Sequence, residues 1–185
     1  MIEKEPNESA VNYTRSLRAV LKSQYHAALA MLRQAISLCP DETWDSRGHL
    51  TPCWQIAYHT LFFAHLYIQP NEQTFRPWEH HQADVQYPDG IPGPPDPKSS
   101  LPLAPNPYTK AEVLAYWSVC DLMVDDAIDA LDLLSRESGF SWYKVPKLEH
   151  QIVNIRHIQH GAAQLADRVR STAGVGVDWV QACRF

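Results

Sequence analysis

Apolar residues return every three or four positions in four stretches of the chain, which is the spacing of a buried helical face. The first stretch covers residues 9–38 and ends at Cys39 and Pro40; its apolar positions are Leu17, Leu21, Tyr25, Leu29, Leu32 and Ile36. The second, residues 52–68, contains WQIAYHTLFFAHLYI and is apolar on nearly every side. Such a helix is expected to pack among several neighbours at the centre of the core.

Capping residues mark where the second and third helices begin. Thr51 can accept hydrogen bonds from free amides, and Pro52 suits a first helical position, so we expect both to start the second helix. Thr109 and Glu112 have the spacing of a capping box and open a third helix over residues 109–135.

The fourth periodic stretch, residues 148–172, is stopped by Gly174 and Gly176. Between the second and third helices, residues 69–107 hold ten of the fourteen prolines, which remove backbone donors that helices and interior strands need. This segment is predicted to be a long crossover loop, ordered by packing Phe75, Trp78 and Tyr87 against the helices. It is open whether the loop has a function or is a surface wrap or dimer contact.

Four helices without any alternating strand pattern predict an all-α fold, a four-helix bundle with one long crossover. At 185 residues and 45% hydrophobic, the chain is sized for one domain, residues 1–185. The net charge of -5 and the absence of a basic run argue against nucleic acid as a partner. The polar N-terminus and the lack of a long apolar run indicate a cytoplasmic protein without membrane contact.

Two sets of polar residues have ordinary explanations beside chemical ones. The four cysteines form no CxxC pair and are expected to be buried, unreactive thiols: Cys39, Cys53, Cys120 and Cys183. The aspartates of the third helix are more typical of a solvated face than of a site for a hard cation: Asp121, Asp125, Asp126, Asp129 and Asp132.

Histidines provide the main chemical clue, because nine are present and neutral imidazole is the commonest protein metal ligand. His59 lies midway along the most apolar helix, and NIRHIQHGAAQL places His157 and His160 on the fourth helix. If these two helices are neighbours, His59 and His157 converge inside the bundle. A core histidine bonded to another polar group is the alternative.

The pairing of YHTLFF on the second helix with NIRHIQHGAAQL on the fourth resembles the DinB superfamily, over most of the chain. The resemblance implies a divalent metal, zinc or nickel, held by one histidine of the second helix and two histidines four residues apart on the last. These ligands correspond to His59, His157 and the position of Gly161, so the third histidine is missing.

His160 is an imperfect substitute, since it is rotated about 60° to the other side of His157 on a helix that turns roughly 100° per residue. Gly161 is expected to leave a small hollow beside His157. We name His59, His157 and His160 as candidate metal ligands, and Gln164 or Tyr58 as candidate hydrogen-bonding groups nearby.

Two functions remain open at this point. One is a metal-dependent enzyme, a thiol-dependent transferase or a hydrolase-like protein, in which the resemblance implies a low-molecular-weight thiol as co-substrate. The other is a non-catalytic bundle that has lost the metal and binds a small molecule or dimerises. Relatives of this kind imply a homodimer. An interaction module acting through the proline-rich loop is disfavoured, because the loop lacks a clear PxxP ligand in a basic context.

Overall fold

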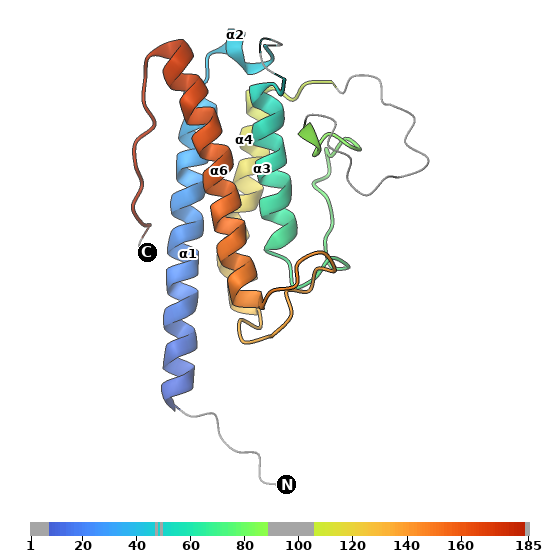
Figure 1. Ribbon diagram of the computed structural model, residues 1–185, viewed down its shortest axis with the longest axis vertical. Helices are drawn as coiled ribbons and strands as arrows, with labels where there is room; N and C mark the ends of the chain where they lie inside the picture. The colour runs from blue at the N-terminus through green and yellow to red at the C-terminus, as the bar shows by residue number, and fades with distance from the viewer. Residues whose placement is uncertain (1–7, 47, 49, 89–105, 184–185) are drawn as a thin grey trace.

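The structure is a computed structural model that describes residues 8–46, 48, 50–88 and 106–183, and this part of the chain is all-α, without strands. Its helices are α1 (Glu8–Leu38), α2 (Asp41–Trp44), α3 (Cys53–Tyr67), α4 (Lys110–Leu122), α5 (Val124–Ala130) and α6 (Lys147–Ala173). Figure 1 shows α1 and α6 running in one direction, with α3 and α4 running in the other.

Helix α6 contacts both α1 and α3, while α4 contacts α1 and α3 from the other side. Aliphatic and aromatic side chains from all four helices form one core, with Leu32 and Ile36 of α1, Leu61 of α3 and Leu165 of α6 fully buried. The histidine-bearing helices are therefore neighbours, as the convergence of their histidines requires.

Three of the predicted helices are confirmed, and each of their ends differs from the prediction by at most one residue. Residues 9–38, 52–68 and 148–172 correspond to α1, α3 and α6. Gly174 ends α6 in the left-handed region (φ 68°), where the lack of a β-carbon avoids strain. The expected cap by Thr51 is wrong, because Pro52 is the N-cap residue of α3 and the Thr51 hydroxyl is buried without a hydrogen-bond partner among the described residues.

The prediction of one continuous third helix over residues 109–135 is wrong, because the structure has two shorter helices there, α4 and α5. The capping box is present, with the Thr109 hydroxyl and the Glu112 carboxylate each bonding the other's backbone amide, but α4 ends at Leu122 and α5 ends at Ala130. Beyond α5 the backbone is extended at Leu131, whose carbonyl accepts a hydrogen bond from Arg18 at 3.0 Å. This side chain from α1 satisfies carbonyls at the end of α5, so residues 131–135 need not remain helical.

The crossover loop is only partly described, and residues 89–105 of the predicted segment 69–107 lie outside the described residues. In the described part the expected aromatic packing is confirmed. Trp78 stacks on Tyr116 of α4 with ring centroids 4.8 Å apart, and Phe75 contacts Phe62 of α3 at 5.2 Å. The short helix α2 was not predicted from the sequence.

A line of polar side chains on α6 donates to backbone carbonyls on and beside α3. Asn154 bonds the Ala64 carbonyl at 3.0 Å, Gln151 bonds the Tyr67 carbonyl at 3.1 Å, and Arg168 bonds the Thr51 carbonyl at 2.6 Å. Such bonds fix the rotation and register of the two helices more narrowly than apolar contacts alone, because each donor must meet one particular acceptor. His157 lies on the same helix, between Asn154 and Arg168.

Candidate functional site

His59 is oriented by the crossover loop. Its Nδ1 donates to the Gln86 carbonyl at 2.7 Å, and since a carbonyl only accepts, Nδ1 carries the proton. In the neutral ring, Nε2 therefore bears the lone pair. Because Gln86 belongs to the crossover loop, the loop helps to set the tautomer of His59.

His157 faces His59 from α6, with ring centroids 5.1 Å apart and planes inclined by 63°. Its Nε2 is buried and has no hydrogen-bond partner among the described residues. Burial, reinforced by the nearby His59 and His160, lowers the pKa of His157 to about 4, so the ring is neutral at physiological pH. A neutral, unpartnered imidazole nitrogen is an available hydrogen-bonding or ligating atom.

A cavity of about 500 Å³ opens beside these two rings, between α3, α6 and the crossover loop. Its apolar wall includes Ile56, Phe63 and Tyr87, and its polar lining includes Gln164 and Arg168 beside the histidines. This volume lies within the range of ordinary small-molecule pockets. Gln164 is thus placed at the pocket as predicted.

Tyr58, the other candidate hydrogen-bonding group, is not at this pocket. Its hydroxyl lies 2.5 Å from His81 Nδ1, and its ring stacks on Tyr108 at 4.7 Å, on the side of α3 that faces the crossover loop and α4. Tyr58 and His59 are consecutive, so a helical turn of roughly 100° per residue separates them around α3. The proposed neighbourhood of Tyr58 and the two histidines is therefore wrong.

Gly161 and His157 both line the cavity, but the space that a side chain at position 161 would enter is occupied by Thr60 of α3. A β-carbon placed on Gly161 would lie 2.0 Å from Thr60 Oγ1 and 2.9 Å from Thr60 Cβ. Thr60 is held in place because its hydroxyl donates to the Ile56 carbonyl at 2.8 Å. Glycine at 161 permits this close approach of α6 to α3.

Residues that could complete a metal site are not brought together in the described part of the chain. No group of three or more histidine, cysteine, aspartate or glutamate side chains is arranged to hold a metal ion there. His160 lines the pocket but is exposed on α6. His59 and His157 fit two positions of the three-histidine arrangement, while Thr60 occupies the space beside the third, so the described residues do not fit the complete set.

Acidic residues of α4 and α5 contact His26 and Lys22 of α1. Asp121 Oδ1 lies 2.7 Å from His26 Nδ1, and Asp129 Oδ2 lies 2.8 Å from Lys22 Nζ, while Asp125 lies near both partners. These contacts agree with a helix face that meets α1 and solvent. They supply an explanation for the aspartates that involves no metal.

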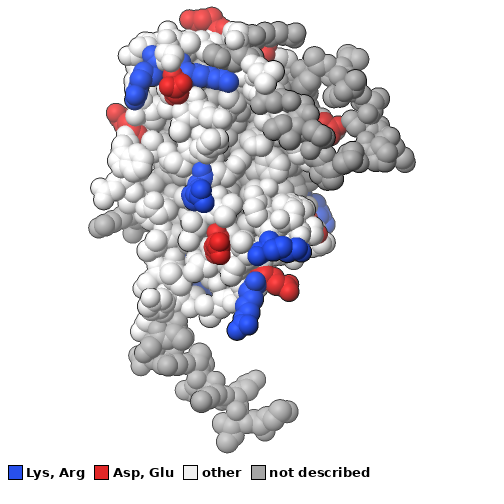
Figure 2. Space-filling model, viewed as in Figure 1, with Lys and Arg blue, Asp and Glu red and all other residues white. Residues whose placement is uncertain are grey.

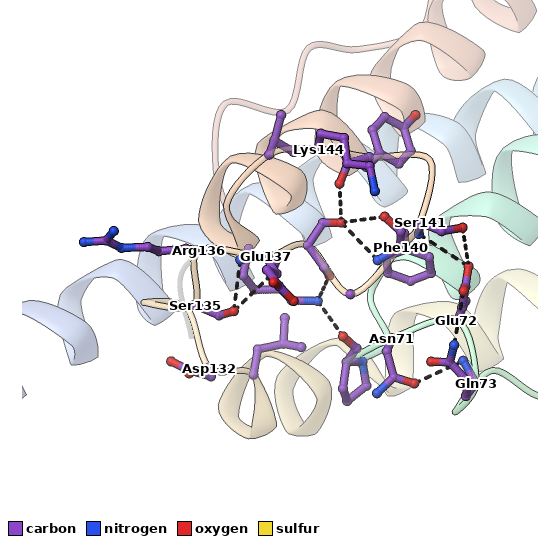
Figure 3. Close-up of a pocket in the computed structure, with 17 residues that line it drawn as sticks. Asn71, Glu72, Gln73, Asp132, Ser135, Arg136, Glu137, Phe140, Ser141 and Lys144 are labelled. Atoms are coloured by element: carbon purple, nitrogen blue, oxygen red, sulfur yellow. Dashed lines mark hydrogen bonds between the residues drawn. The ribbon is translucent and has the colours of Figure 1, made fainter.

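A second cavity, about 750 Å³, lies at the opposite end of α6, between residues 70–73 and 131–147 (Figure 3). Figure 3 shows Glu72 reaching toward Ser141, and the two side chains are joined at 3.2 Å. Lys147 lies in its wall with 4% of its surface exposed, and its Nζ donates to the Pro70 carbonyl at 2.6 Å and to the Ser138 carbonyl. Lys147 thereby ties both loops to the start of α6.

Charge is distributed in small mixed groups on the face shown in Figure 2, where Lys and Arg lie close to Asp and Glu. No helix among the described residues is both long and apolar enough to cross a membrane.

Sequence reasoning missed two contributors to the pocket, Arg168 and Thr60. Arg168 gave no signal beyond being a cation on an amphipathic helix, and Thr60 gave none.

Comparison of the chain with protein-family models, with characterised proteins and with solved structures finds no match. The resemblance to the DinB superfamily therefore stays a prediction that depends on the residues quoted above. What the protein does must be argued from the pocket itself.

Proposed function

We propose that the protein is a four-helix bundle of the DinB type whose pocket between α3 and α6 binds a small, partly aromatic carboxylic acid. The observation that carries this proposal is the buried, unpartnered Nε2 of His157 in the wall of a pocket of about 500 Å³. A buried polar atom without a partner costs free energy, which a ligand that bonds to it recovers.

The lining indicates the chemical class of the ligand. Phe63 and Tyr87 offer aromatic surface, and Arg168 offers a guanidinium that pairs with carboxylates through two parallel hydrogen bonds. The neutral His157 and the oriented His59 supply hydrogen-bonding atoms without a net charge. A ligand with an apolar ring and one acidic group matches this combination.

Benzoate and larger aryl carboxylates are suitable probes, with binding followed by NMR of the histidine side chains. We expect the ring signals of His157 to shift, and His157→Phe to weaken binding by about fivefold, since one hydrogen bond contributes on the order of 1 kcal/mol. His150→Phe is the matched control, because His150 is on the same helix but does not line this pocket. Unshifted His157 signals in the wild type, or equal affinities of His157→Phe and His150→Phe for the probe, contradict the proposal.

A metal-dependent enzyme is the second candidate, favoured by the facing of His59 and His157. His59 and His157 would hold zinc or nickel, and the metal would polarise a substrate or a low-molecular-weight thiol. Calorimetric titration with Zn²⁺ and Ni²⁺ separates the two candidates. One tightly bound equivalent that is lost in both His59→Ala and His157→Ala favours the metal, whereas weak binding that these variants do not change removes it.

Restoring the missing ligand requires two substitutions. Gly161→His alone would drive its β-carbon into Thr60 Oγ1, 2.0 Å away, so it must be combined with Thr60→Gly. If the double variant binds Zn²⁺ at least a hundredfold more tightly than the wild type, a third histidine ligand is what this chain lacks.

A homodimer stays a prediction, and analytical ultracentrifugation tests it.

A further inference from the structure

The pocket between α3 and α6 contains a second buried polar atom that lacks a partner. Thr51 is 5% exposed, and its hydroxyl oxygen is buried without a hydrogen-bond partner among the described residues. Thr51 lines the same pocket as His157, whose Nε2 is in the same position. By contrast, the Thr60 hydroxyl is bonded to the Ile56 carbonyl. A buried polar atom without a partner costs free energy, which a ligand that bonds to it recovers.

The two unpartnered atoms lie at different ends of the pocket. Thr51 precedes the first turn of α3, whereas His157 faces His59 in the middle of that helix. Arg168 lies beside Thr51, because its Nη1 donates to the Thr51 carbonyl at 2.6 Å. The pocket therefore has a histidine end, formed by His59 and His157, and an arginine end, formed by Thr51 and Arg168.

The helical repeat of α6 explains why both ends open into one pocket. Arg168 follows His157 by 11 positions, and at roughly 100° per residue the two return to the same face after three turns. Gly161 and Gln164, which also line the pocket, lie on this face between them. A rise of about 1.5 Å per residue puts the two backbone positions about 16 Å apart. The arginine side chain leans toward the amino end of its helix, so the two polar groups are on the order of 10 Å apart.

The arginine end suits an anion. Arg168 is half-buried, and none of the ion pairs between described residues includes it. Within the described ranges, no aspartate or glutamate lines the pocket. A carboxylate that pairs with the guanidinium can also accept a hydrogen bond from the Thr51 hydroxyl, since a hydroxyl donates and a carboxylate accepts. Thr51 then gains the partner that it lacks.

The histidine end suits a hydroxyl on an aromatic ring. An imidazole Nε2 donates in one tautomer and accepts in the other, and a hydroxyl matches both because it donates and accepts. Phe63 lies beside this end, with its ring centroid 4.8 Å from that of His59 and 5.9 Å from that of His157. A ring that packs against Phe63 therefore carries its hydroxyl toward His157.

We propose that the ligand of this pocket is a para-hydroxylated aryl carboxylic acid, with its carboxylate between Arg168 and Thr51 and its ring hydroxyl on His157 Nε2. This inference rests on the proposed function and adds to it a second polar group and the position of that group on the ring. Para substituents stand at opposite ends of a ring, and with a hydrogen bond of about 3 Å at each end they span a distance comparable to that between the two ends of the pocket. Benzoate has a polar group on one side only, so it serves one end at a time.

Calorimetric titration of the full chain with three acids tests the inference. Para-hydroxybenzoate should bind at least fivefold more tightly than benzoate, because it makes one further hydrogen bond. Ortho-hydroxybenzoate should bind no more tightly than benzoate, because its hydroxyl lies next to the carboxylate and does not reach the other end. Equal affinities, or a preference for the ortho acid, would overturn this inference and leave the proposed function standing. No binding of any of the three acids would overturn both.

Thr51→Val tests the arginine end, since it removes the hydroxyl and keeps the shape of the side chain. We expect the variant to fold, because the lost hydroxyl has no partner among the described residues. It should bind para-hydroxybenzoate about fivefold more weakly and leave the affinity for para-methylphenol, which has no carboxylate, unchanged. Thr43→Val is the matched control, because Thr43 is also buried, at 7% exposed, but does not line the pocket. An equal loss for the acid and the phenol would contradict the placement of the carboxylate at Thr51.

His157→Phe tests the histidine end through a ratio of affinities. The preference for para-hydroxybenzoate over benzoate, at least fivefold in the wild type, should fall to about one in this variant, because the hydroxyl loses its partner. His150→Phe should keep the wild-type ratio, since His150 does not line this pocket. A preference that persists in His157→Phe would overturn the assignment of the ring hydroxyl to Nε2.

Discussion

His150 and His157 lie on one helix, two turns apart, and invite comparison. Burial is the main cause that lowers the pKa of each to about 4. Both ring nitrogens of His150, and Nε2 of His157, are buried without a hydrogen-bond partner among the described residues. Yet His150 is enclosed by the rings of Tyr67, Phe140 and Tyr143, at centroid distances of 5.1, 4.9 and 4.8 Å, whereas His157 lines a pocket.

The difference teaches that a shifted pKa and an unpartnered nitrogen do not define a site on their own. The same features occur in a histidine used as an aromatic-like core residue. What separates His157 is a cavity beside the ring and a second histidine, His59, that faces it from α3. Predictions that alter the two ends of α6 separately can test this distinction.

Removing the Lys147 ammonium should have the largest effect. Lys147→Met keeps the apolar stem but leaves the Pro70 and Ser138 carbonyls buried without this donor, so we expect unfolding free energy to fall by about 2–5 kcal/mol. Urea denaturation measures the change. Lys144→Met is the control, since Lys144 lines the same cavity but is exposed, and its effect should stay within about 0.5 kcal/mol. Equal losses would show that Lys147 does not anchor the loops.

Acidification should destabilise the protein through both histidines. Each has a folded-state pKa of about 4 against an ordinary value of 6.5, so the unfolded chain takes up the proton first. Stability is complete above the ordinary pKa and is lost as pH falls toward the folded value, by up to about 3 kcal/mol per histidine. His150→Phe and His157→Phe should each flatten this dependence without abolishing it, because His65 titrates with a similarly lowered pKa of about 4.

Urea denaturation at several pH values between about 7 and 4 measures that slope. At neutral pH, His150→Phe should preserve or raise stability, since it removes unpartnered nitrogens from an aromatic environment. A slope in His150→Phe identical to the wild type would mean that this histidine is not kept neutral by burial.

Helix faces could be predicted from the sequence because burial imposes their periodicity residue by residue. That is also why His59 and His157 could be expected to face each other, as both lie on interior positions of helices that pack together. The end of the third predicted helix could not be predicted from the sequence, because Arg18 of α1, far away along the chain, donates to the Leu131 carbonyl. Such long-range donors leave no trace in a local pattern.

Contacts within the candidate site depend on the register between helices, which the pattern of apolar positions leaves free by a residue or more. The close approach of Thr60 to Gly161 is an example, because it depends on how α3 and α6 are aligned. The absence of a histidine at 161 was visible in the sequence, but the side chain that fills its place was not.

The smallest of the expected effects tests that close contact. Gly161→Ala places a β-carbon 2.0 Å from Thr60 Oγ1, so Thr60 must rotate or α6 must shift, at a cost of about 2 kcal/mol in urea denaturation. The same substitution in a Thr60→Gly background should be neutral, because the opposing side chain is gone. Gly176→Ala is the control, since its β-carbon would meet only Arg170 Nη2, at 3.9 Å. A loss that persists in the Thr60→Gly background would mean that the backbone of α6, and not Thr60, requires glycine at this position, and that a histidine there could not be accommodated by altering α3.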